Sequence, residues 1–343
     1  MALDPQHLTP DASINRAIIT DDPAGNLSPH VRGRQAYDLV STHALDQLLD
    51  VHRDALGLLP GDITHAHRQQ FWERLRTQSA PALQIATRLG ENLGSLLLTL
   101  RRGDATSRAA RPEWDESYWA YWAQISHIVL GGGLALPPLG PHIATTATQL
   151  LKEHGYAFTI QIARLPLFLP LLGAARHAHA DTCVFDFGGT QVKRALACYE
   201  AGTLIQLADL GSLPHADALP RNPEMRVRAL FEEMVALITQ TLAEHNTPGA
   251  VIPISIASYI DQGHPMRAID TGYYVLHRLP APLAVMLSER LGKRVVLLHD
   301  GTAAAAAHAG LPNAAVIQIG TALGVGFPPP STVGLAPLGP DLR

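Results

Sequence analysis

The chain has 343 residues, a formal net charge of −4, and 47% apolar against 16% charged residues. This length allows two domains with separate cores, and the apolar fraction excludes wholesale disorder. No block of Lys and Arg supports a nucleic-acid partner, and the apolar runs are too short and too rich in proline to span a bilayer. We therefore expect a soluble, cytoplasmic protein with neither a nucleic-acid nor a membrane partner.

The first part of the chain predicts mainly helices. Residues 1–33 are polar and contain Pro and Asp, which predicts a loop or a short edge segment. Apolar residues then recur at helical spacing over 37–51 and over 69–100, with a break near Pro81. A charged connector is expected at 101–112.

Aromatic side chains are concentrated in residues 114–122. Such a cluster could be a stacking platform for a sugar or a base, but more often it is a packed helix face or an interface, and we favour a packed face or an interface. The elements expected next are a buried strand that leads into three glycines, a helix, a strand and a helix, at 127–130, 143–153, 158–162 and 166–177.

From residue 181 the pattern becomes typical of strands. Two apolar runs separated by Gly188-Gly189-Thr190 predict a β-hairpin. The elements expected after it are a strand at 204–208, an amphipathic helix at 227–242, a strand at 251–257, a helix at 283–291, a strand at 294–299, an alanine-rich helix opened by Asp300, a strand at 315–319 and a loop at 328–343.

The hairpin carries groups suited to a phosphate and a metal ion. Successive N–H groups in a glycine turn can accept an anion, and the Thr190 hydroxyl adds a donor. Asp186, at the mouth of the turn, is suited to holding Mg²⁺ through water. The alternatives are an ordinary tight hairpin with an exposed Asp and, for Lys193, a solvated strand lysine.

The same arrangement recurs near the C-terminus. Residues 316–321 are again an apolar strand followed by glycine and threonine, at Gly320 and Thr321. Two lobes that each offer one such turn could hold a polyphosphate between them. Asp300 lies between the two motifs in the sequence, directly after a predicted strand.

These motifs together resemble the ROK-type sugar kinases of the actin/hexokinase/Hsp70 ATPase superfamily, over roughly residues 36–327. The family patterns and their counterparts here are Asp-x-Gly-Gly-Thr-x-x-Lys at Asp186 to Lys193, Asn-Asp before a small-residue helix at His299 to Ala304, Gly-Thr-Gly-x-Gly at Gly320 to Gly324, the adenosine motif at Ile128 to Gly133, and a later Gly-Ala-Ala at Gly173 to Ala175.

In that family the adenosine motif comes last, whereas here it precedes the first phosphate motif. The chain therefore resembles a circularly permuted member with a two-lobed α/β actin-like ATPase (ribonuclease H-like) fold. The resemblance implies an adenosine-side lobe at 1–178, a first-phosphate and acceptor lobe at 179–312, and the first strands and second phosphate turn of the larger lobe at 313–343. The strand at 315–319 should then share a sheet with 127–130.

The resemblance implies phosphoryl transfer from ATP-Mg²⁺ to a hydroxyl. Asp300 would be the general base, although an Asp at this place also suits a helix N-cap. Asp186 would position Mg²⁺. The residues implied in holding the nucleotide are Asp186, Gly188, Gly189, Thr190, Lys193, Gly320, Thr321, Gly324, Gly131, Gly132 and Gly133.

The sugar side departs from the family pattern. Two distant cysteines cannot form the family's zinc loop, so no structural zinc is expected, and its Glu-x-Gly-His sugar segment has no clear counterpart. His299 replaces an Asn that usually contacts the sugar. We assign acceptor contacts to His299, Asp261 and Tyr273. Asp270 lies with the last two in the segment 258–275. A carbohydrate kinase with a small-molecule partner is therefore weighed against a nucleotide-binding sensor or regulator that has lost the sugar site, and a homodimer is left open.

Overall fold

The structure, a computed structural model, describes residues 3–20, 29–214, 222–267 and 273–342. The chain divides into two compact units, each of mixed α/β structure. The first unit comprises Met1–Leu3, Asp11–Leu167 and Asn313–Val325, and the second comprises Asp4–Pro10, Phe168–Pro312 and Gly326–Arg343.

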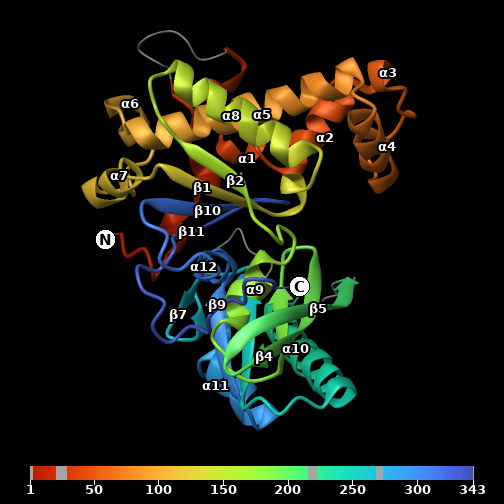
Figure 1. The fold of residues 1–343 in the computed structure, drawn as a ribbon, viewed down its shortest axis with the longest axis vertical. Helices are drawn as coiled ribbons and strands as arrows, with labels where there is room; N and C mark the ends of the chain where they lie inside the picture. The colour runs from red at the N-terminus through yellow and green to blue at the C-terminus, as the bar shows by residue number, and fades with distance from the viewer. Residues whose placement is uncertain (1–2, 21–28, 215–221, 268–272, 343) are drawn as a thin grey trace. The chain divides into compact units, whose positions relative to one another are not determined.

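The first unit contains a four-stranded sheet in the order β11-β10-β1-β2 (Figure 1). Its strands are β1 (His127–Gly131), β2 (Thr159–Ile162), β10 (Ala314–Ile319) and β11 (Leu323–Gly326). Both β10 and β2 run parallel to β1, and Ile128 lies opposite Ala315. The predicted sharing of one sheet by 127–130 and 315–319 is confirmed.

The first part of the chain supplies most of its helices and turns to this unit. They are α1 (Ala36–Leu39), α2 (Thr42–Val51), α3 (Arg53–Leu56), α4 (His65–Arg76), α5 (Ala80–Arg102), α6 (Ala105–Ala109), α7 (Glu116–Trp122) and α8 (Leu139–Glu153), with 3-10 turns η1 (Pro10–Ala12), η2 (Ile14–Arg16), η3 (Pro29–Val31) and η4 (Gly133–Ala135). The longest, α5, packs closely on the crossover helix α8, because a Cβ at Gly90 would lie only 2.5 Å from Thr146 Cβ. No helix in the described ranges is both long and apolar enough to cross a membrane.

Local helix caps explain where the helices of the structure differ from those expected from the sequence. The helix expected over 37–51 is divided at Ser41, whose hydroxyl accepts the N–H of Ala44 and so starts a new helix. The expected break near Pro81 is confirmed, since α5 begins at Ala80. The connector at 101–112 contains the short helix α6, capped by Asp104. The aromatic stretch is a packed face, with Trp119 among its buried rings.

The second unit contains a five-stranded sheet in the order β5-β4-β3-β6-β9. Its strands are β3 (Thr182–Phe187), β4 (Gln191–Glu200), β5 (Thr203–Pro214), β6 (Val251–Ile256) and β9 (Arg294–His299), and β7 (Ile260–Asp261) and β8 (His264–Pro265) form a separate small hairpin. The β3–β4 pair is the predicted antiparallel hairpin. In contrast, β3, β6 and β9 run parallel to one another.

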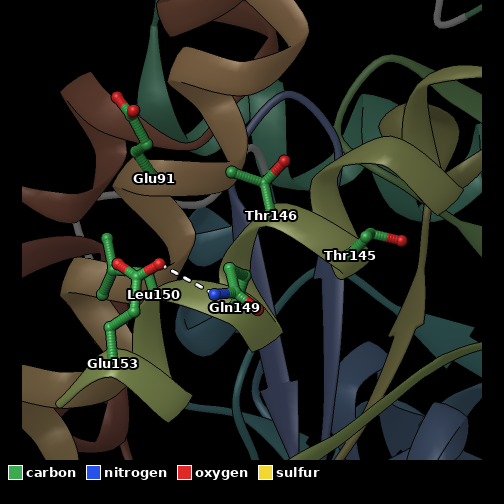
Figure 2. A pocket seen from close by; sticks show the side chains of 6 residues that line it. All are labelled: Glu91, Thr145, Thr146, Gln149, Leu150 and Glu153. Carbon is green, nitrogen blue, oxygen red and sulfur yellow. Dashed lines mark hydrogen bonds between the residues drawn. The ribbon is translucent and has the colours of Figure 1, made fainter.

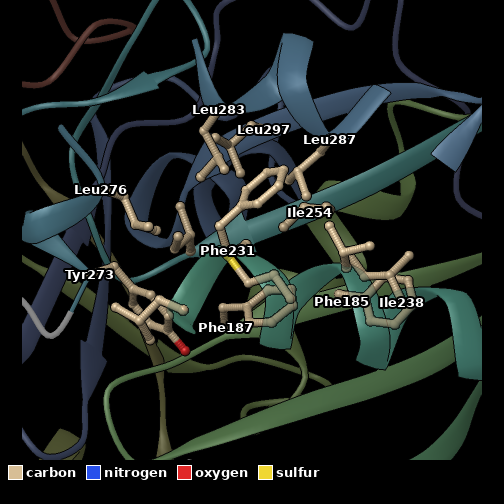
Figure 3. Packing of buried hydrophobic residues seen from close by; sticks show 14 of the residues in the cluster. Phe185, Phe187, Phe231, Ile238, Ile254, Tyr273, Leu276, Leu283, Leu287 and Leu297 are labelled. Carbon is tan, nitrogen blue, oxygen red and sulfur yellow. The ribbon is translucent and has the colours of Figure 1, made fainter. Parts of the chain in front are cut away.

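The core of the second unit is built around the buried strands β3 and β6. Its helices are α9 (Leu169–Ala175), α10 (Pro223–His245), α11 (Leu283–Leu291) and α12 (Asp300–Ala306), with the 3-10 turn η5 (Tyr274–Arg278). Figure 3 shows Phe185 and Phe187 from β3 packed with Phe231 and Ile238 from α10. This core fixes the sheet whose strand ends carry the polar groups described below.

By its contacts, the helix that follows β2 groups with the second unit. Helix α9 lies directly against α12, because a Cβ at Gly173 would be 1.6 Å from the carbonyl oxygen of Ala303. Arg176, at the end of α9, is buried and donates to the carbonyl oxygens of Ala306 (2.5 Å) and Ala336 (2.9 Å). It thereby ties the C-terminal tail to both helices.

Candidate functional site

Three parallel strands of the second unit end side by side. The register pairs Asp186 on β3 with Ser255 on β6, and Ile256 on β6 with His299 on β9. Ligands of open α/β sheets bind at the carboxyl ends of such strands. The edge that carries Asp186, Ser255 and the His299-Asp300 pair is therefore the candidate site.

Asp186 is a buried carboxylate whose two oxygens both have protein partners. It is 2% exposed. Its Oδ1 accepts from Ser255 Oγ at 2.9 Å, and its Oδ2 forms an ion pair with Lys193 Nζ at 3.0 Å. Lys193 lies directly opposite on β4, so it is not a solvated strand lysine. These partners hold the carboxylate at the strand end in spite of its desolvation.

The glycine turn next to Asp186 presents open backbone. The N–H of Gly188 donates to the carbonyl oxygen of Gln191 at 3.2 Å, which closes the hairpin, while Gly189 and Thr190 are exposed. A Cβ at Gly189 would meet no atom within 4 Å. Neither Gly188 nor Gly189 is among the described residues with positive φ. The glycines therefore leave space beside the turn rather than allowing an unusual backbone conformation.

Asp300 follows β9 and is the first residue of α12. Its Oδ1 accepts the N–H of Gly301 at 2.7 Å and lies 3.1 Å from His299 Nε2. The side chain is 26% exposed. Burial and the negative charge of Asp186 raise the pKa of the Asp300 carboxyl to about 7, against the opposing effects of the Gly301 N–H and Lys193. Near neutral pH this carboxyl can both accept and release a proton.

The helix cap lies one residue earlier than the sequence suggested. The N-cap of α12 is His299, whose Nδ1 accepts the N–H of Thr302 at 3.3 Å. The His299 ring also stacks on Tyr259, with ring centroids 4.5 Å apart. Burial lowers the pKa of His299 to about 3, so the ring is neutral at pH 7. The capping alternative for Asp300 is therefore wrong.

The other residues expected in an acceptor pocket lie in different surroundings. Tyr273 is buried in the core and meets Phe187 edge to face (Figure 3). Asp261 is exposed on β7. The Ser258 hydroxyl is buried and bonds to none of the described residues. Asp270 lies outside the described residues.

The glycine motifs of the first unit also meet at a strand edge. Gly131 ends β1 beside β10, and Gly132 has φ +86° with its Cα so close to β10 that a Cβ would lie 2.4 Å from the carbonyl oxygen of Ile319. The next residue, Gly320, accepts the N–H of Thr42 at 2.8 Å, and Thr321 is exposed. The structure thus brings the predicted adenosine loop beside the second predicted phosphate turn.

The candidate residues divide between the two units. Asp186, Gly188, Gly189, Thr190, Lys193, Asp261, Tyr273, His299 and Asp300 belong to the second unit, and Gly131, Gly132, Gly133, Gly320, Thr321 and Gly324 to the first. Gly133 has open space where its Cβ would be, and a Cβ at Gly324 on β11 would lie 3.5 Å from the Cβ of Gln318.

Sequence reasoning missed two residues of the site. Ser255 is the one hydroxyl among the apolar residues of 254–256, and a polar side chain in a buried strand is itself a signal that it has a polar partner. Tyr259 gave no such signal, because its stacking on His299 depends on the path of the chain after β6.

Within the described ranges, no three His, Cys, Asp or Glu side chains come together as a preformed metal cluster. A hollow of about 350 Å³ on the first unit lies apart from the glycine motifs, on α5 and α8. Figure 2 shows its lining residues, Glu91, Thr145, Thr146, Gln149, Leu150 and Glu153. None of them is a predicted site residue.

No protein-family model and no curated protein sequence matches the chain. Among solved structures, the ethanolamine utilization protein EutJ from Carboxydothermus hydrogenoformans aligns at 13% identity, over 59% of this chain and 69% of that chain, with a TM-score of 0.29. A TM-score this low carries no argument about fold or function.

Proposed function

We propose that the protein transfers a phosphoryl group from ATP to a hydroxyl of a sugar or sugar-like small molecule, as a carbohydrate kinase with a two-lobed actin-like ATPase fold. One observation carries this proposal. A single strand edge holds a buried Asp186–Lys193 pair, an open glycine turn and Asp300, whose carboxyl has a pKa of about 7. Phosphoryl transfer needs groups that position Mg²⁺, groups that bind the phosphates and a base that removes the proton of the acceptor hydroxyl.

Asp300 is the general base in this proposal. A base works best when its pKa lies near the working pH, because it is then ionised and still basic enough to take a proton. Burial and Asp186 bring the pKa of Asp300 into that range. The exposed turn at Gly189 and Thr190 would bind phosphate oxygens through backbone N–H groups and the Thr190 hydroxyl.

Mg²⁺ fits the charges at this edge. Two carboxylates, Asp186 and Asp300, stand near a single ammonium group, Lys193, and the charge of Asp186 already disfavours ionisation of Asp300. Both oxygens of Asp186 have protein partners, which suits a metal held through its water shell rather than by direct ligation. When bound, Mg²⁺ would neutralise charge on the phosphate groups.

The fold part of the proposal, including circular permutation, is supported by a repeat in sheet topology. The order β4-β3-β6-β9 in the second unit matches β11-β10-β1-β2 in the first, with a hairpin followed by two parallel neighbours. Because only three residues connect β10 to β11, these two strands cannot run parallel and must form a hairpin. The chain order differs, since the hairpin comes first in the second unit and last in the first. If the first unit is circularly permuted so that its hairpin comes first, the strands of both units follow in the same order along the chain.

The lobe boundaries at 1–178, 179–312 and 313–343 stay part of this proposal. The helices after the last strand of each repeat also correspond, because α9 follows β2 and α12 follows β9. These two helices pack against each other at Gly173.

A nucleotide-binding sensor without a sugar site is the second candidate. The observation in its favour is that two expected acceptor residues, His299 and Tyr273, are 7% and 2% exposed. Their side chains serve the packing of the protein, which leaves few groups assigned to an acceptor.

A thermal-shift experiment separates these functions. We expect ATP-Mg²⁺ to raise the melting temperature by binding the native state. Sugars and polyols should then be screened with ATP-Mg²⁺ for a further rise and for phosphorylated product by mass spectrometry. Product supports the kinase, a nucleotide response with no product from any acceptor supports the sensor, and no response to ATP-Mg²⁺ contradicts both.

A further inference from the structure

We propose that Asn15 is a positioning residue of the nucleotide site, which holds the second phosphate turn, Gly320-Thr321-Ala322, in place before ATP binds. This role rests on the proposed function, in which that turn binds phosphate oxygens. The turn connects β10 to β11, and Thr321 and Ala322 are exposed. A Cβ at Gly320 would lie 3.9 Å from the nearest atom beyond its chain neighbours, so the space beside the turn is open.

The side-chain amide of Asn15 pairs with the backbone of Leu323, the residue directly after the turn. Asn15 Nδ2 donates to the Leu323 carbonyl oxygen at 2.8 Å, and Asn15 Oδ1 accepts the Leu323 N–H at 2.8 Å. A backbone N–H can only donate and a carbonyl oxygen can only accept, so the two bonds fix the orientation of the amide. They reproduce the pair of bonds that a neighbouring antiparallel strand would make. Asn15 therefore acts as one residue of a further strand beside β11, the edge strand of its sheet.

The segment that carries Asn15 is itself fixed in the first unit. Ile14, its neighbour in η2, is fully buried. The Ser13 carbonyl oxygen accepts from the buried guanidinium of Arg111 at 2.9 Å. Asn15 Nδ2 also donates to Ser13 Oγ at 3.2 Å, so each of its two hydrogens has an acceptor. A side chain bonded in this way on a fixed backbone has little freedom to leave Leu323.

A second contact holds the other end of the turn. The N–H of Thr42 donates to the Gly320 carbonyl oxygen at 2.8 Å. Thr42 is the first residue of α2, so this N–H is one of those that have no partner within their own helix. The turn is therefore bonded at its first residue and directly after its last one, while Thr321 between them is exposed.

Holding both ends lowers the free-energy cost of binding a phosphate at the turn. A turn that is loose before binding must be ordered by the ligand, and ordering the backbone of one residue corresponds to about a tenfold change in affinity. A turn whose ends are already held avoids part of this cost. Only groups that contact the turn benefit, so the contacts should strengthen binding of the ATP phosphates and not of adenosine.

Two substitutions remove the two contacts separately. Asn15→Ala removes both bonds to Leu323. Thr42→Pro removes the N–H that Gly320 accepts, and a helix tolerates proline at its first position. Ser41, which precedes it, has φ −152° and ψ 175°, and this extended backbone is compatible with a following proline.

Thr87→Val is the matched control, because it removes a bond of 2.8 Å, from Thr87 Oγ1 to His142 Nε2, that joins α5 to α8. In calorimetry, Asn15→Ala and Thr42→Pro should each weaken ATP-Mg²⁺ binding by ~10-fold and leave adenosine binding within ~2-fold of the wild type. Thr87→Val should change neither affinity. Wild-type ATP-Mg²⁺ affinity in Asn15→Ala would overturn the assignment, and so would an equal loss of ATP-Mg²⁺ and adenosine affinity, which is what a purely structural role would produce.

Amide hydrogen exchange measures the contact without nucleotide. Asn15→Ala should speed exchange of the Leu323 N–H by ~5-fold or more, the scale of one lost hydrogen bond, while amides in the middle of β10 keep their wild-type rates. An unchanged Leu323 rate would refute the contact. If the wild type itself binds no ATP-Mg²⁺, the proposed function fails and the phosphate role of Asn15 fails with it, whereas the exchange rate still decides whether Asn15 orders the turn.

Discussion

Replacing Asp300 with Asn should stabilise the protein above neutral pH. The folded state holds the Asp300 proton up to pH about 7, whereas an unfolded carboxyl releases it near its ordinary value of 3.8. Between these pH values the unfolded state is favoured by ionisation, so the wild type loses stability as pH rises. Asn carries no titratable proton and avoids this loss, and its side-chain oxygen can still accept the Gly301 N–H that Oδ1 accepts.

The magnitude follows from the two pKa values. A rise from 3.8 to about 7 corresponds to ~4 kcal/mol if it is fully expressed, since each pKa unit is worth ~1.4 kcal/mol. The side chain is 26% exposed, and solvent relaxation lowers this value. We expect Asp300→Asn to be more stable than the wild type by ~2 kcal/mol above pH 7, with the difference shrinking toward zero near pH 4.

Urea denaturation between pH 4 and pH 8.5 measures this difference, in the transition that reports unfolding of the second unit. The exposed Asp261 provides the control, because Asp261→Asn is expected to follow the wild-type curve at each pH. A stability difference between Asp300→Asn and the wild type that is the same at every pH would refute the reasoning, and so would an Asn variant that unfolds.

Three further predictions concern the glycines and the buried arginine. Gly132→Ala should lower the free energy of unfolding by ~2 kcal/mol or more, because Gly132 has φ +86° and a Cβ would lie 2.4 Å from the Ile319 carbonyl oxygen. Gly133→Ala, where a Cβ would meet open space, should lower it by well under half as much. Urea titration measures both values, and equal losses would contradict the prediction. Gly189→Val should abolish the ATP-Mg²⁺-induced rise in melting temperature with little change in the apo protein, and an undiminished rise would place the phosphates elsewhere. Arg176→Met should cost ~2–4 kcal/mol and expose the tail around residue 336 to proteolysis, and an unchanged cleavage rate would mean that Arg176 does not hold the tail.

Much of the fold could be predicted because its signals are local. The Gly188-Gly189-Thr190 turn between apolar runs gave the hairpin, and the apolar run ending at His299 gave β9 with Asp300 at its end. The order of the motifs along the chain predicted that 315–319 would join the sheet of 127–130, and the pairing of β10 with β1 confirms it. Short capped elements were missed, because α6 depends on one Asp104 side chain.

The internal arrangement of the site was less predictable. The pairing of Asp186 with Lys193 depends on the hairpin register, and its bond from Ser255 depends on which strand lies next to β3. The stacking of Tyr259 on His299 depends on tertiary packing that spacing in the sequence does not encode. The sequence pattern therefore placed Asp300 at the end of a strand, while its hydrogen bond from the Gly301 N–H required coordinates.

The central claim is that Asp300 removes the proton of an acceptor during transfer from ATP. The most direct test compares the wild type and Asp300→Asn in two measurements, ATP-Mg²⁺ affinity by calorimetry and the rate of transfer to the best acceptor found in the screen. The account predicts that ATP-Mg²⁺ affinity is retained and that the transfer rate falls at least ~10²-fold, the low end for losing a positioned base. An Asp300→Asn variant that transfers phosphate at the wild-type rate would contradict it.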